Sequence, residues 1–173
     1  TTMVARHEDR PKSKFFIDNL FDDFISLSGD RYYGEDKSVL TGFGNFNGTS
    51  VLVIGQEKGE NLETRIERNF GMMRPEGYRK TIRLMNLANK FSIPIISFID
   101  TPGAYPGVGA EERGQAEAIA KSIECCMELK VPTLAIIIGE GGSGGAIALA
   151  SSSKVIMLEN AIYSVISPEG CAT

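Results

Sequence analysis

The chain has 173 residues, of which 42% are hydrophobic and 23% are charged, and its formal net charge is −4. This composition is typical of one globular domain and excludes a fibrous or disordered chain. The mild negative charge argues against a nucleic-acid binder. No apolar run approaches the roughly 20 residues that span a bilayer, so no membrane span is expected.

The first part of the chain predicts a helix and then a hairpin. Residues 15–28 place their apolar side chains on one face, which indicates an amphipathic helix that stops at Gly29. The hairpin consists of a strand near residues 38–46, an Asn-Gly turn at residues 47–48, and a strand at residues 50–56.

The remainder alternates helices with buried strands, which indicates a layered α/β domain with a largely parallel sheet. Its helices are expected at residues 75–91, at about 111–130 and from Gly144 onward. Its strands are expected at residues 93–100, 133–139, 154–158 and 161–167. Ser167, Pro168 and Glu169 give a helix-start signal just before the sequence ends, so the chain is expected to be cut inside its fold.

Cysteine and histidine give no sign of a metal or nucleophile site. Cys125, Cys126 and Cys171 lack metal-ligand spacing, and we interpret them as structural, reduced thiols in a cytosol-like compartment. The single histidine, His7, lies in a polar N-terminal segment and is expected to be solvated. The commonest general base is therefore missing.

The stretch from Ile136 to Ala150 places five glycines between residues 139 and 145, after an apolar strand and before a small-residue helix. Residues 139–144 match the dinucleotide pattern G-x-G-x-x-G, and Glu159 stands where a ribose-binding acid would be expected. However, that fingerprint normally follows the first strand of its sheet. A nucleotide-phosphate site is weaker still, because no phosphate-binding loop precedes the D-x-x-G match at residues 100–103.

The third interpretation is an oxyanion site. The backbone N–H groups of Gly144 and Gly145 would lie in the first turn of a helix, at the positive end of its dipole. Residues 100–114 offer a second wall, in which Pro102 and Pro106 stiffen the loop. The alternative is that these glycines only permit tight packing between strand and helix.

Charged residues near these turns have ordinary interpretations. Asp100 and Glu140 end successive predicted strands and could form a carboxylate pair, but solvated or capping roles are expected. The segment 57–83 carries seven basic and five acidic residues, which favours a solvated helix face with ion pairs. An anion site, for a coenzyme A phosphate or an acidic partner, is the alternative for this segment.

Several motifs in order, "RNFGM", "PEGYRK", "FIDTPGAYPGVGAEERGQAEAIA", "IGEGGSGGAIALA" and "YSVISPEGCA", closely resemble one family. It is the carboxyltransferase alpha subunit of the multisubunit acetyl-CoA carboxylase of bacteria and plastids. The resemblance, which runs from about Arg6 to the last residue, implies a crotonase-like fold of repeated ββα units with layered, mostly parallel sheets. Residues 1–173 would form a single, incomplete domain, because family members extend beyond both ends.

The resemblance also implies a reaction and a compartment. The complex transfers a carboxyl group from carboxybiotin, on the biotin carboxyl carrier protein, to acetyl-CoA, and the malonyl-CoA formed is the first committed product of fatty acid biosynthesis. Biotin would supply the base, so no catalytic histidine is required. Two alpha and two beta subunits assemble, a separate biotin carboxylase uses ATP, and zinc belongs to beta, so no metal is expected here. The location implied is the bacterial cytoplasm or a plastid stroma.

The motifs assign site residues as well. The resemblance places the oxyanion hole at the backbone N–H groups of Gly144 and Gly145, which are expected to serve biotin while beta holds most of the coenzyme A. The neighbouring pocket walls would comprise Gly103, Ala104, Tyr105, Pro106, Gly107, Gly141, Gly142 and Ser143.

Two other kinds of function remain open from the residues. One is a dinucleotide-binding oxidoreductase, which would use Glu159. The other is a non-catalytic crotonase-like scaffold that only assembles partners.

Overall fold

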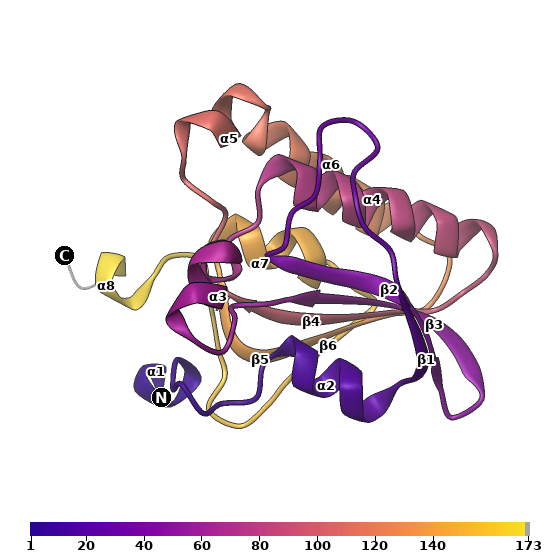
Figure 1. Ribbon diagram of the computed structural model, residues 1–173, viewed down its shortest axis with the longest axis horizontal. Helices are drawn as coiled ribbons and strands as arrows, with labels where there is room; N and C mark the ends of the chain where they lie inside the picture. The colour runs from indigo at the N-terminus through magenta and orange to yellow at the C-terminus, as the bar shows by residue number, and fades with distance from the viewer. Residues whose placement is uncertain (172–173) are drawn as a thin grey trace.

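The computed structural model describes residues 1–171, which form one seven-stranded sheet with helices on both faces (Figure 1). The strands are β1 (Asp22–Ser26), β2 (Val39–Phe46), β3 (Thr49–Gln56), β4 (Ile95–Thr101), β5 (Thr133–Gly142), β6 (Lys154–Met157) and β7 (Ile162–Ser164). The longer helices are α2 (Ser13–Leu20), α4 (Pro75–Lys90), α6 (Gln115–Glu128) and α7 (Ser143–Ala150). The short ones are α1 (Thr2–Ala5), α3 (Leu62–Glu67), the 3-10 turn η1 (Asn69–Gly71), α5 (Val108–Glu112) and α8 (Pro168–Cys171).

The sheet has the order β1-β2-β3-β4-β5-β6, and β7 pairs separately with β5. β1, β2 and β3 are antiparallel neighbours, whereas β3 through β6 run parallel, and β7 is parallel to β5. The predicted hairpin is confirmed, because Phe46 pairs with Thr49 across a turn in which Asn47 and Gly48 have φ of 48° and 89°. The mixed α/β architecture with a mostly parallel sheet is also confirmed.

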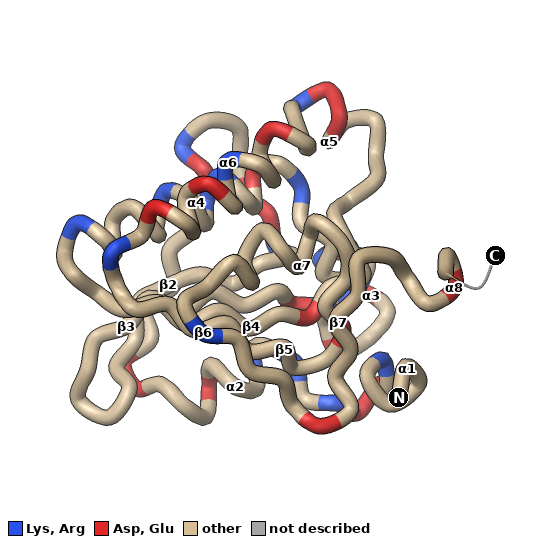
Figure 2. Tube along the Cα trace, turned by 180° about the vertical axis from the view of Figure 1, so that it is seen from behind, with Lys and Arg blue, Asp and Glu red and all other residues tan. Residues whose placement is uncertain are grey.

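Two apolar cores lie on opposite faces of the sheet. The larger contains side chains of α4, α6 and α7, such as Leu84, Ala118 and Leu149, against Ile54 and Ile99 of the sheet. The smaller packs α2 onto the other face. Basic and acidic residues are interspersed along α4 and α6 (Figure 2), but Glu76 and Lys80 of α4 are only 3% and 1% exposed, so the solvated helix face expected for segment 57–83 is wrong for these residues.

The expected helix over residues 15–28 is wrong beyond Leu20. Phe21 ends α2 with extended dihedrals of −122° and 133°, and it is buried in the smaller core. Asp22–Ser26 then pairs with β2 as an edge strand. The apolar side chains of residues 15–28 have helical spacing, but pairing with β2 selects the extended conformation after Leu20.

Other boundaries moved by a few residues. The helix expected at about 111–130 is divided into α5 and α6 at Gly114, whose φ is 82°. The last expected strand, 161–167, is reduced to β7, while the helix-start signal at Ser167 is confirmed by α8. Helices α1 and α3 lie in segments for which the periodicity predicted no element.

Candidate functional site

The loop after β4 forms the first wall of the site, and it is held at several points. The backbone N–H of Tyr105 donates to the carbonyl of Met73 at 3.0 Å. The side-chain amide of Gln115 donates to the carbonyls of Met73 and Tyr105 at 2.8 and 3.0 Å. The Arg74 guanidinium lies 4.5 Å from the centroid of the Tyr105 ring. The loop is therefore fixed by the segment just before α4 and by a side chain of α6, as well as by its prolines.

The second wall is the turn from β5 into α7, and its position corrects the sequence analysis. The residues Gly139 to Gly142 were expected to form a glycine turn, but β5 continues through Gly142, and the helix begins at Ser143 rather than Gly144. The chain reverses at Ser143, which has φ of 52°. Because four of the predicted turn residues are strand, the pyrophosphate-binding turn of the dinucleotide interpretation is absent here.

The first turn of α7 carries Gly144, half-buried, and Gly145, buried. Its N-cap is Gly142, and no side chain caps the helix. The first N–H groups of a helix have no partner within it and lie at the positive end of the helix dipole. The turn therefore presents backbone donors to the space beside it, which is the property that an oxyanion site requires.

The two walls are in direct contact. A Cβ on Gly145 would lie 2.6 Å from the carbonyl carbon of Gly103 and 2.7 Å from the nitrogen of Ala104, and a Cβ on Gly142 would overlap the Pro102 carbonyl. Only glycine permits this approach of two backbones. The structure thus brings together Gly103, Ala104, Gly142 and Gly145, as the sequence analysis expected.

The other predicted wall residues are less close. Gly141 pairs with Tyr163 of β7 and is buried in the sheet. Gly107 contacts the Tyr105 ring and is the N-cap of α5, and Pro106 between them is exposed. Pro106 and Gly107 therefore lead away from the turn rather than line it.

An apolar hollow of about 290 Å³ lies beside α7, lined by Ile147, Tyr163, Ser164 and Val165. Ser164 pairs with Gly142, the residue before the turn. The lining of the hollow is mainly apolar, so it suits an uncharged group rather than an ion.

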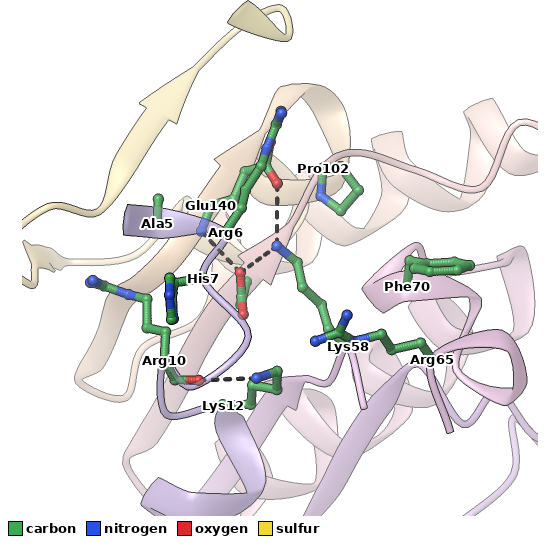
Figure 3. Close-up of a pocket in the computed structure, with 11 residues that line it drawn as sticks. Ala5, Arg6, His7, Arg10, Lys12, Lys58, Arg65, Phe70, Pro102 and Glu140 are labelled. Atoms are coloured by element: carbon green, nitrogen blue, oxygen red, sulfur yellow. Dashed lines mark hydrogen bonds and ion pairs between the residues drawn. The ribbon is translucent and has the colours of Figure 1, made fainter. Parts of the chain in front are cut away.

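A buried ionic cluster, which the sequence analysis missed, lies at the carboxyl ends of β4 and β5 (Figure 3). Lys58 Nζ lies 2.8 Å from Asp100 Oδ1 and 3.2 Å from Glu140 Oε2. Arg6 contacts Glu140 Oε1 at 2.6 Å and also pairs with Glu169 of α8. We call Arg6, Lys58, Asp100 and Glu140 the ionic cluster.

Burial in this cluster corrects two expectations. Asp100 and Glu140 are 4% exposed, so neither is solvated, and Lys58 does not lie on a solvated helix face. Burial opposes the ionisation of Glu140, but hydrogen bonding from Arg6 and the charge of Lys58 outweigh it and lower the pKa of this carboxyl. The sequence indicated that the two acids end successive strands and could form a carboxylate pair, but it did not indicate that Lys58 and Arg6 join them.

A pocket of about 190 Å³ adjoins the cluster and is also lined by His7, Arg10, Arg65 and Phe70. The His7 side chain is 62% exposed, as expected. Arg10 is occupied by the carbonyls of Ile138 and Glu159, at 2.6 and 2.8 Å. Glu159 thus accepts a hydrogen bond from Arg10 through its backbone oxygen, and no contact in the structure supports the ribose-binding role considered for it.

Within residues 1–171, no group of three or more potential metal ligands comes together, and no helix is long and apolar enough to cross a membrane. The three cysteines are free, with Cys125 and Cys126 buried and Cys171 exposed. Burial raises the pKa of the Cys125 thiol to about 11 and that of Cys126 to about 12. The two buried thiols are therefore poor nucleophiles.

Comparison of the backbone with solved structures identifies similar folds. The transcarboxylase 12S core aligns with a TM-score of 0.82 at 21% identity, covering 97% of this chain and 32% of that one. A single-chain, multi-domain long-chain acyl-CoA carboxylase aligns with a TM-score of 0.78 at 20% identity, covering 99% and 18%. At these identities the likeness shows the fold, which confirms the crotonase-like carboxyltransferase architecture.

Comparison of the sequence gives closer relatives. The chain is 89% identical over 173 residues to the acetyl-coenzyme A carboxylase carboxyl transferase subunit alpha of Pelagibacter ubique (strain HTCC1062), covering 100% of this chain and 47% of that protein. It is 60% identical over 172 residues to the subunit of the same name in Rhodopseudomonas palustris (strain HaA2), covering 99% and 54%. The chain spans about half the length of the curated relatives it matches.

A family model described as acetyl co-enzyme A carboxylase carboxyltransferase-like matches residues 1–173. The match includes both walls of the site and the ionic cluster. This chain belongs to the acetyl-CoA carboxylase carboxyltransferase family.

Proposed function

We propose that this chain is part of the alpha subunit of an acetyl-CoA carboxylase and helps to transfer a carboxyl group from carboxybiotin to acetyl-CoA. The observation that carries the proposal is the uncapped first turn of α7 pressed against the loop after β4. The family membership and the relatives' names support the same assignment.

The residues fit biotin at this site. Biotin has an uncharged ring with a ureido carbonyl, the first turn of α7 offers uncapped backbone donors to such a carbonyl, and the hollow lined in part by Ile147 of the same helix is mainly apolar. The carboxylated form, delivered by the biotin carboxyl carrier protein, supplies the carboxyl group and, once CO₂ has left, a base for the acetyl methyl proton.

The task of this chain is then to stabilise charge. The N–H groups of Gly144 and Gly145 donate to the ureido oxygen as negative charge develops on it. Removing one such donor costs roughly 100- to 1000-fold in kcat. Contact between the walls excludes water from the donors, which strengthens their hydrogen bonds.

The remaining partners follow from this assignment. A beta subunit, in an alpha-two beta-two assembly, holds most of the coenzyme A and the second oxyanion hole, and biotin carboxylase recharges the carrier. Malonyl-CoA, the product, feeds fatty acid biosynthesis in the bacterial cytoplasm. Residues 1–173 act as a single domain that is completed by other parts of the subunit.

The test uses the full-length alpha subunit co-expressed with its beta partner. Conversion of malonyl-CoA to acetyl-CoA, the reverse reaction, is measured with and without free biotin. We expect biotin-dependent turnover that falls at least about 100-fold in Gly145→Val, since the new side chain forces apart the two walls.

The matched control is Gly34→Val. A Cβ on Gly34 meets nothing within 4 Å, and its φ is not positive, so this variant should keep full turnover. An assembled wild-type complex without biotin-dependent turnover would overturn the proposed function. Unchanged turnover in Gly145→Val would show that the first turn of α7 is not the oxyanion hole.

A further inference from the structure

Strand pairing becomes irregular just before the site, where β3 stops pairing with β4 and the β4–β5 ladder skips Asp100. β3 pairs with β4 only as far as Gly55 and Phe98. The register between β4 and β5 shifts between Ile99, opposite Ile137, and Thr101, opposite Gly141. Ladder hydrogen bonds therefore do not hold the strands together at Asp100, although this residue is buried.

Side chains replace the missing ladder. Asp100 Oδ1 accepts a hydrogen bond from the N–H of Glu140 at 2.9 Å and an ion pair from Lys58 at 2.8 Å. The N–H of Asp100 donates to Oε1 of Gln56 at 3.2 Å. Irregular strand pairing next to a site commonly changes the direction of the strand, and here it directs β5 toward the first wall.

Gln56, the last residue of β3, reaches both walls at once. It is 0% exposed, and its Nε2 donates to the carbonyl oxygen of Gly145 at 2.8 Å and contacts the Met73 sulfur at 3.5 Å. Its Oε1 holds the N–H of Asp100, two residues before Pro102, which begins the first wall. One buried amide thus spans the strand that leads into one wall and the helical turn that forms the other.

We propose that Gln56 is a positioning residue, which sets the spacing between the loop after β4 and the first turn of α7. The proposal rests on the proposed function, because the turn it positions is the one assigned to the oxyanion. Gln56 itself touches no substrate. It acts by fixing the carbonyl of Gly145, and thereby the first turn of α7 to which the donor N–H groups belong.

The amide is chemically specific for this task. One end must donate to a carbonyl oxygen and the other must accept from an N–H, and glutamine supplies both at this length. Methionine keeps the length but supplies neither bond, so in Gln56→Met the buried N–H of Asp100 loses its partner. Glutamate keeps the acceptor for Asp100 but has no donor for the Gly145 carbonyl once it is ionised, and burial raises the pKa at which it ionises.

The experiment compares Gln56→Met and Gln56→Glu in the full-length alpha–beta complex, assayed by biotin-dependent conversion of malonyl-CoA. A displacement of about 1 Å in a catalytic group costs roughly 100-fold in rate. We therefore expect kcat to fall about 100-fold in Gln56→Met, and in Gln56→Glu at a pH where the buried carboxyl is ionised. KM for malonyl-CoA should change less than about threefold, because the lost interaction belongs to the transition state.

The matched control is Ser122→Ala. Ser122 is also 0% exposed, and its Oγ donates to the carbonyl of Ala148 at 2.7 Å, at the other end of α7. This variant loses a buried hydrogen bond to the same helix, but at a distance from the turn. It should therefore lower Tm by a few degrees and leave kcat unchanged.

A second readout is independent of turnover. Amide hydrogen exchange should accelerate at Asp100, whose N–H donates to Gln56 Oε1, in Gln56→Met and stay unchanged there in Ser122→Ala. Loss of kcat with this local acceleration supports the proposal. Gln56→Met with kcat within threefold of wild type overturns it, as does a loss no larger than that of Ser122→Ala.

Failure of the proposed function is distinguishable. If the wild-type complex shows no biotin-dependent turnover, the carboxyl-transfer assignment fails, and exchange alone tests the positioning role. If Gln56→Met does not fold, the glutamate variant, which matches glutamine in shape, provides the comparison. Unaltered exchange at Asp100 in folded Gln56→Met overturns the positioning role in that case too.

Discussion

The two ends of the β4–β5 pair differ in their strand register and in the polarity of their buried side chains. At the amino end, residues from Ile95 to Ile99 pair with Thr133 to Ile137 in continuous register, and most side chains there are apolar. At the carboxyl end the register shifts, and the buried side chains are carboxylates that face Lys58. The same two strands are thus regular where they only pack and irregular where they approach the site.

The difference shows how the site is supported. At the amino end, hydrogen bonds of the ladder and apolar packing are sufficient. At the carboxyl end the β4–β5 register shifts past Asp100, Gly142 lies against Pro102, and the ionic cluster and Gln56 hydrogen-bond the groups of Asp100 that the ladder skips. Substitutions in the ionic cluster or at the wall contact should therefore change the stability and geometry of the site, whereas substitutions between Ile95 and Ile99 or between Thr133 and Ile137 should change packing alone.

The largest expected effect comes from Lys58→Met. It leaves Asp100 buried without its ion pair and Glu140 with Arg6 alone. Loss of one partner from a buried ion pair typically costs about 3 to 5 kcal/mol. Urea unfolding of the full-length protein should show a decrease of this size in the free energy of unfolding.

The exposed pair between Lys121 and Glu117 on α6 is the matched control. Lys121→Met should change the free energy of unfolding by less than about 0.5 kcal/mol, because exposed i,i+4 pairs contribute little. Equal effects of the two substitutions would show that the ionic cluster does not support the carboxyl end.

The next effect is expected for Gly145→Ala. Its Cβ would lie 2.6 Å from Gly103, and overpacking of this kind costs typically about 1 to 3 kcal/mol. Gly144→Ala is the control, since its Cβ would meet Ile119 at an ordinary 3.6 Å. Thermal unfolding of both variants measures the difference, and a Tm for Gly145→Ala at or above that of Gly144→Ala contradicts the close contact.

A smaller effect is expected from the regular half. Ile137→Val removes one buried methylene group and should cost about 1 kcal/mol. Because Ile137 lies before the register shift, kcat should stay at the wild-type level. A clear loss of kcat in this variant would mean that packing throughout the strands, and not only their carboxyl ends, determines the geometry of the site.

The smallest effect should be seen by comparing Glu140→Gln with wild type across the acid range. The folded-state pKa of Glu140 is lowered from its ordinary value of 4.5, so its ionised form contributes stability above about that pH. This contribution is lost as the pH falls through the folded-state pKa. The stability difference between wild type and Glu140→Gln should therefore shrink below pH 4.5, and a constant difference would rule out this linkage.

Much of the fold could be predicted from the sequence, because its signals are local. The Asn-Gly turn and Pro75 each mark a boundary by their own backbone preferences. The bend at Phe21 could not be predicted in this way, since the apolar residues of 15–28 suit a helix and only pairing with β2 selects the strand. The turn predicted at Gly139 to Gly142 was wrong for the same reason. These residues locally favour a turn, but pairing of Glu140 to Gly142 with β7 makes them a strand.

The candidate site divides similarly. Motifs identified Gly103, Ala104, Gly142 and Gly145, which meet in the structure. They did not reveal Gln56 or Lys58, because nothing in the surrounding sequence distinguishes a buried amide or ammonium group from an exposed one. Their importance depends on Gly145, Asp100 and Glu140, which are more than 40 residues away along the chain.

The burial of two of the three thiols makes the chain a convenient spectroscopic tool. Cys125 and Cys126 are shielded and protonated at neutral pH, whereas Cys171 is exposed on α8. A maleimide dye should therefore react at Cys171 and report from the helix that Glu169 ties to Arg6. Its fluorescence anisotropy would reveal, without any assay of turnover, when α8 detaches from the N-terminal segment.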